Sequence, residues 1–78
     1  MIKADGFNSA IIGIDNENER IVYDKNKMIE ILIQDGMDYK GALEHLEHNV
    51  WGCYVGEHTP IYVYPMNIDE IETRFPSF

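Results

Sequence analysis

The sequence contains a single cysteine, Cys53, so no disulfide bond can form within the chain. Secreted domains of this size are usually held together by several disulfides. The first residues lack the basic start and apolar run of a signal peptide, and no apolar stretch approaches the length of a membrane-spanning helix. We therefore expect a cytoplasmic protein that does not enter the membrane.

Basic residues are also scarce. Six Lys and Arg stand against fourteen Asp and Glu, which gives a formal net charge of −8. Proteins that bind nucleic acids or anionic membrane surfaces directly use clusters of Lys and Arg, and this sequence has no such cluster. We expect neither kind of binding. The acidity serves either solubility alone or an acidic face that meets a basic partner.

The chain is short, with 78 residues, of which 45% are hydrophobic. This composition is typical of a globular protein and predicts one domain spanning residues 1–78. A domain of this size buries only about 60% of the surface of its unfolded chain. The core is therefore expected to be shallow, which favours a surface that binds something over a deep active site.

The first part of the sequence predicts a β-hairpin. Residues 10–14 are apolar and mostly β-branched, as in a strand buried on both faces, and Gly13 within them indicates a bulge. Residues 15–19 are polar turn formers, and residues 20–23 return as the second strand.

Two helices follow with almost no connection between them. Asp24 is placed to cap a helix over residues 25–35, and Gly36 fits the left-handed position that ends it, with Met37 packing back on Leu32. Asp38 is placed to cap the second helix. Its apolar side chains recur at helical spacing, at Tyr39, Ala42, Leu43, Leu46 and Val50.

The last part predicts a third strand and a short helix. Prolines at both ends of residues 60–65 favour a strand at the edge of the sheet, with Ile61 and Val63 on one face and Tyr62 and Tyr64 on the other. Asn67 and Glu70 form a capping-box pattern before a helix that ends near Phe75. The fold class is thus α+β: a small antiparallel β-sheet, consisting of the β-hairpin plus a third strand, packed against an α-helical hairpin, with a short C-terminal helix.

Histidines and the cysteine are the residues that suggest enzymatic chemistry. His45 and His48 can share a helix face, with His58 and Cys53 downstream. Their order does not match the HExxH or HxxEH motifs, and a structural zinc site would need more cysteines. Cys53 among aromatic neighbours is typical of a small buried hydrophobe. A metal-dependent or thiol-dependent enzyme is therefore the third-ranked hypothesis, and we expect no metal and no cofactor.

Aromatic residues suggest a contact surface. Trp and Tyr are enriched where proteins bind other proteins. If Ile61 and Val63 face the core, the tyrosines between them face outward, unless the terminal helix covers them. The candidate partner-binding residues are Trp51, Tyr54, Tyr62 and Tyr64.

The same region supports a second interpretation, in which a nucleotide-like small molecule binds at an interface between subunits. Aromatic rings would stack on a base, and the turn between two glycines would offer backbone amides. The candidate ligand-binding residues are Gly52, Tyr54, Gly56 and Glu57. The net charge argues against an anionic ligand, and the loop lacks the Lys-Ser/Thr ending of a P-loop.

About three quarters of the chain, from residue 5 to residue 63, resembles a family of small proteins of tailed bacteriophages. The resemblance is carried by Asp5-Gly6-Phe7, Ala10-Ile11-Ile12-Gly13, Val22-Tyr23-Asp24, Asp35-Gly36-Met37, Asn49-Val50, Gly52, Tyr54-Val55-Gly56-Glu57 and Thr59-Pro60, with the last stretch the most specific. It implies a phage origin, a location in the infected host and an accessory role in infection. It brings no catalytic residues and no substrate.

Together these features predict a protein that is not an enzyme and that binds a host or phage protein, as an inhibitor or modulator of a host factor, defence systems included. We also expect a homo-oligomer. The first helix carries apolar residues over an arc too wide for one small sheet to cover, namely Met28, Ile29, Ile31, Leu32 and Ile33.

Overall fold

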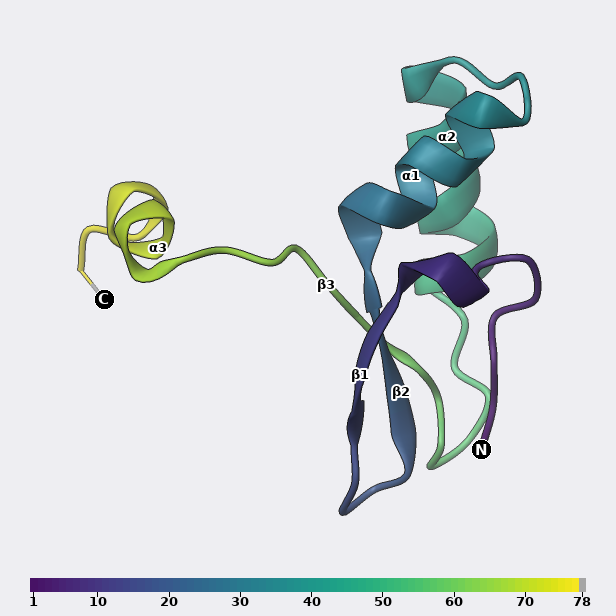
Figure 1. Ribbon diagram of the computed structural model, residues 1–78, viewed down its shortest axis with the longest axis horizontal. Coiled ribbons are helices and arrows are strands. Elements are labelled where there is room, and N and C mark those ends of the chain that lie inside the picture. Colours follow the sequence, from purple (N-terminus) through teal and green to yellow (C-terminus); the bar gives the residue numbers. More distant parts are fainter. Residues whose placement is uncertain (78) are drawn as a thin grey trace.

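The computed structural model describes residues 1–77 and contains three strands and three α-helices (Figure 1). In chain order they are a 3₁₀ turn η1 (Asn8–Ala10), β1 (Ile11–Asp15), β2 (Arg20–Asp24), α1 (Lys25–Gln34), α2 (Tyr39–Leu46), a π-helical turn η2 (Glu47–Trp51), β3 (Ile61–Val63) and α3 (Ile68–Arg74). The α+β class, the hairpin, the helical hairpin and the short C-terminal helix are confirmed.

The sheet is mixed, because β3 runs parallel to β2 and not antiparallel as we expected for the third strand. Its order is β1-β2-β3, so β3 lies at an edge, as its flanking prolines predicted. After β2 the two helices run out and back, and residues 52–60 then return to the end of the sheet where β2 began (Figure 1). A strand that starts from that end must run in the same direction as β2.

The predicted cap and stop signals are confirmed. The Asp24 carboxylate accepts hydrogen bonds from the backbone amides of Asn26 and Lys27. At the other end of α1, Gly36 has a φ of +108°, and the Met37 amide donates to the Leu32 carbonyl at 3.1 Å. This is the Schellman geometry that lets the chain turn directly into α2.

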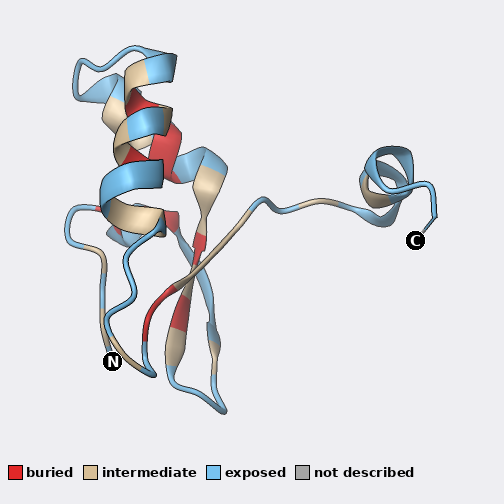
Figure 2. Ribbon diagram, turned by 180° about the vertical axis from the view of Figure 1, so that it is seen from behind, coloured by how far each residue is buried: buried red, intermediate tan, exposed pale blue. Residues whose placement is uncertain are grey.

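The core lies where the helical hairpin meets β2 (Figure 2). Tyr23, Met28 and Leu46 are the largest fully buried side chains. Most of the apolar arc of α1 is covered within the chain, since Met28 and Ile29 are buried and only Ile33 is clearly exposed. The width of this arc therefore gives no reason for a second subunit, because η1 and α2 cover what the sheet alone would not.

The expectation that β1 is buried on both faces is wrong. The register shifts between Ile11 and Gly13, which confirms the bulge, but Ile11, Ile12 and Ile14 are all exposed. On the side of the sheet that carries Tyr23, the cover consists of the N-terminal segment, whose Ala4 amide donates to the Tyr23 hydroxyl, and of Tyr62. The core cluster and the side chains packed against it include Ile21 and Tyr23 of β2 and Tyr62 of β3, but no residue of β1.

The helix α3 stands apart from the other elements, at the end of an extended segment (Figure 1). Within residues 1–77, no pair of elements with extensive contacts includes α3. The radius of gyration is 13.6 Å, whereas a compact chain of this length would have about 11.5 Å. The capping box of Asn67 and Glu70 satisfies amides at the start of this helix from within the segment itself.

Candidate protein-binding surface

A rigid loop, residues 52–60, forms the centre of the candidate surface. The Thr59 hydroxyl accepts a hydrogen bond from the Val55 amide at 3.0 Å and donates to the Gly56 carbonyl at 2.6 Å. Gly56 has a φ of +110°, which a side chain would strain. Because Thr59 is buried, these bonds are shielded from water and fix the shape of the loop.

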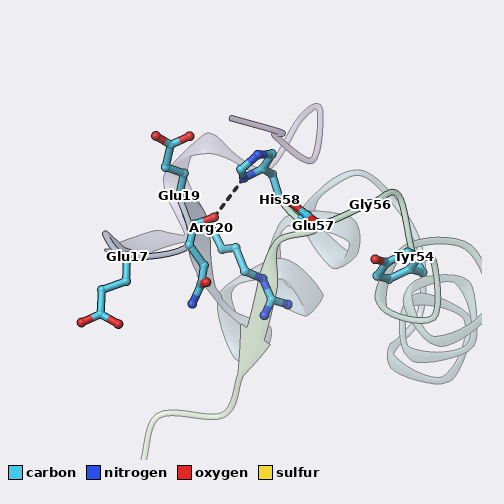
Figure 3. A pocket seen from close by; sticks show the side chains of 8 residues that line it. Glu17, Glu19, Arg20, Tyr54, Gly56, Glu57 and His58 are labelled. Atoms are coloured by element: carbon cyan, nitrogen blue, oxygen red, sulfur yellow. Dashed lines mark hydrogen bonds between the residues drawn. The ribbon is translucent and has the colours of Figure 1, made fainter.

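Two further bonds join this loop to the β1–β2 hairpin. The Arg20 Nε donates to the Thr59 carbonyl at 2.6 Å, and His58 Nδ1 lies 2.9 Å from the Asn18 carbonyl (Figure 3). A carbonyl only accepts, so His58 Nδ1 carries the proton in this contact. Residues 52–60 are thus held from within and from a segment about forty positions away in the sequence.

Tyr54 is the most exposed aromatic side chain that the loop presents. It is 78% exposed, and its neighbour Val55 is 54% exposed. Tyr54 lies across an open hollow of about 770 Å³ from the turn of the hairpin (Figure 3). The hollow is lined by Glu17, Asn18, Glu19, Arg20, Tyr54, Gly56, Glu57 and His58. An apolar body on a fixed loop, surrounded by charged groups, is the geometry of a protein-binding anchor.

The half-buried Trp51 and the exposed Tyr64 form a second group around Lys25. Their rings meet edge to face with centroids 6.2 Å apart, and the Lys25 Nζ lies 4.5 Å from the Trp51 centroid and 4.9 Å from that of Tyr64. The Trp51 Nε1 donates to the Met28 sulfur at 3.4 Å. Trp51 is the last residue of the π-helical turn η2, which places its ring beside Lys25. Gly52 follows directly, where a Cβ would lie 3.0 Å from the Glu47 carbonyl oxygen, so a side chain there would crowd the turn.

Tyr62 belongs to the core and not to the exposed surface. In the register of the sheet it lies beside Tyr23, and their rings stack with centroids 5.5 Å apart. The condition under which both tyrosines would face outward, with Ile61 and Val63 toward the core, is therefore not met, since Tyr62 packs against the core and Ile61 and Val63 lie on the opposite face. Because β3 runs parallel to β2, Tyr62 lies beside Tyr23 on the same face of the sheet.

Burial raises the pKa of the Tyr62 phenol above its usual 10.0, with the Tyr23 phenol as a second cause. The unfolded chain ionises this group first, so stability from the neutral phenol is present below pH 10 or so and falls as the pH rises from there. We expect Tyr62→Phe to reduce the delayed part of the phenolate absorbance titration. An unchanged delayed part in Tyr62→Phe would contradict the assignment.

The structure also locates the residues of the ligand-binding hypothesis. Tyr54, Gly56 and Glu57 line the large hollow, and Gly52 lines a smaller one. The smaller hollow, of about 330 Å³, lies beside the large one, and its lining includes Arg20, Lys25, Trp51, Tyr54 and Tyr62. Two of the six basic residues thus lie among the aromatic rings. The local charge is more favourable to an anion than the net charge indicates.

The histidines and the cysteine are not brought together. His45 pairs with the Asn49 amide at 3.4 Å, His58 is tied to the hairpin, and the exposed Cys53 thiol donates to the Asn49 carbonyl. In the part of the chain that the structure describes, no three His, Cys, Asp or Glu side chains are placed to hold a metal ion.

Sequence reasoning did not single out Arg20, Lys25 or Thr59, which position the surface. Each lies in a segment with an ordinary structural explanation: a strand start, the first turn of a helix, and a residue before proline. Only the Thr59-Pro60 pair, within the most specific part of the phage resemblance, gave a signal.

Among residues 1–77, no helix is both long enough and apolar enough to cross a membrane. The chain matches no known family model, no curated protein and no solved structure.

Proposed function

We propose that this chain is a small phage-type accessory protein that acts without catalysis, by binding a protein of the host or of the phage. The observation that carries the proposal is Tyr54, a largely exposed aromatic on a loop held by partly buried hydrogen bonds. Association must compensate for the freedom lost by the groups that it orders. A loop that is already ordered loses little, so the binding energy of its aromatic anchor is retained.

The acidic groups around Tyr54 indicate the character of the partner. Glu17, Glu19 and Glu57 line the same hollow, in a chain of net charge −8. Such a field speeds encounter with a basic surface and weakens as salt screens it. Inhibition or redirection of one host factor, a defence protein included, is the role that this binding would serve.

The test is retention of a partner from lysate of a bacterial host by the immobilised full chain, with a matched pair of variants. Tyr54→Ala should reduce the affinity tenfold or more, as truncation of a central aromatic anchor usually does. Tyr39→Ala is the control, because Tyr39 is also an exposed tyrosine (60%) but lies on α2, away from the loop. A protein retained equally by both variants does not bind through this surface, and no reproducible partner at all would remove the proposal's support.

A second candidate function is the binding of a nucleotide-like molecule, favoured by the placement of Arg20 and Lys25 in the smaller hollow. The rings would contact a base, and the two cations would face its anionic group. Native mass spectrometry of the protein taken directly from cells would show added mass. Lys25→Ala should abolish the added mass. Lys27→Ala, two residues further along α1, should keep it.

A further inference from the structure

The edge strand β1 is the most unusual uncovered surface of the molecule. Ile11, Ile12 and Ile14 are 37%, 52% and 49% exposed. Natural proteins usually protect a free sheet edge with Pro, Lys or a covering element, because its unpaired backbone groups invite another strand. The opposite edge, β3, is protected in this way by Pro60 and Pro65. The β1 edge carries neither proline nor lysine, and the bulge between Ile11 and Gly13 leaves Gly13 to Asp15 in regular register with β2.

We propose that β1 is the surface through which two copies of this chain pair, edge to edge and antiparallel, so that their sheets join into one. The backbone of β1 would supply the hydrogen bonds, and the exposed isoleucines would supply the apolar contact. A strand that pairs with its own copy about a two-fold axis makes a closed dimer.

Charge favours a second copy as the occupant of this edge. Two molecules of net charge −8 repel each other over most of their surfaces, yet residues 6–14 carry no charged side chain. The one acidic residue of β1, Asp15, lies opposite Arg20 within the same sheet. The edge is therefore the place where two copies approach with least repulsion.

The order of residues in β1 is also self-complementary. Counted by residue order, an axis through Gly13 places Ile12 near Ile14 of the second copy and Asp15 near Ile11 and not near another carboxylate, and this pairing must accommodate the bulge between Ile11 and Gly13. A Cβ built on Gly13 would meet nothing within 4 Å, so no atom of the chain obstructs the approach there.

The size of the contact sets its expected strength. The five residues of β1 on each copy form a small contact, below the roughly 1,000 Å² that a specific interface usually exceeds. We therefore expect a reversible dimer whose population depends on concentration. The contact is apolar and contains no ion pairs between the copies that salt could weaken. Added salt should therefore strengthen it, because salt screens the repulsion between the two acidic copies.

The test is the molar mass of the full chain by light scattering coupled to size exclusion, from micromolar to millimolar concentration. The wild type should approach twice its 9.1 kDa as the concentration rises. Ile12→Lys places a charge on the most exposed of the three isoleucines and should keep the mass at 9.1 kDa throughout. Ile33→Lys, at an isoleucine 42% exposed on α1, is the matched control and should leave the dimer intact.

Several results would overturn the inference. They are a wild type that stays at 9.1 kDa at the highest concentration, a dimer that Ile12→Lys leaves intact, and a dimer lost equally in Ile33→Lys. If Phe75→Lys abolishes the dimer and Ile12→Lys does not, the contact is made by the C-terminal segment that contains α3 and not by β1. Should Ile12→Lys fail to fold, Gly13→Lys tests the same edge at a position with open space. Tyr54→Ala should not change the mass, so failure of this inference and failure of the proposed function are distinguishable.

Discussion

Replacement of Leu46 by alanine is expected to lower the free energy of unfolding by about 2–5 kcal/mol, the usual cost of a leucine-sized cavity in a packed core. Leu46 is fully buried, at the junction of α2 and η2, in the cluster that also contains Met28 and Tyr23. A domain of this length has a total stability of only about 4–12 kcal/mol at 0.05–0.15 kcal/mol per residue. One truncation therefore removes a large share of it.

Urea unfolding at a fixed protein concentration measures this change, because any self-association would otherwise alter the apparent stability. Leu43→Ala on the same helix is the matched control. Leu43 is only half-buried and packs against the edge of the cluster, so its truncation should cost clearly less. Equal losses in the two variants would mean that α2 does not present Leu46 to the centre of the core.

Replacement of Thr59 by valine is expected to loosen residues 52–60 while keeping the shape of the side chain. Valine lacks the hydroxyl, so the Val55 amide and the Gly56 carbonyl both lose their partner. Leaving such partly buried groups unsatisfied should lower the free energy of unfolding by about 1–3 kcal/mol. The Arg20 bond goes to the backbone carbonyl of residue 59 and is not removed by the change.

This variant links the loop to the proposed function, because Thr59 is buried and is not itself a contact residue. We expect faster hydrogen exchange of the Val55 amide and weaker retention of the partner bound through Tyr54. Thr73→Val is the control, since the Thr73 hydroxyl bonds only to the Asp69 carbonyl on the exposed helix α3. If Thr59→Val speeds exchange but leaves partner retention unchanged, the order of the loop does not contribute to binding.

The sequence by itself determined the features that depend on near neighbours in the chain. The Asp24 cap, the Gly36 stop, the Asn67–Glu70 capping box and the Gly13 bulge are formed by hydrogen bonds or backbone angles within a few residues. Such signals have few competitors, because the groups they satisfy are fixed by local geometry. The prolines that place β3 at an edge belong to the same class.

The tertiary structure alone decided which faces are covered. Strand alternation separates Tyr62 from Ile61 and Val63, but only the parallel pairing of β3 with β2 places Tyr62 against Tyr23. Likewise, the isoleucines of β1 have the pattern of core residues, yet all three are exposed and none belongs to the core cluster. The hydrogen bonds that join the loop to the hairpin, from Arg20 to Thr59 and between His58 and Asn18, link segments about forty residues apart. They can form only in the folded chain. Periodicity shows which residues share a side, and the placement of the other elements decides which side is buried.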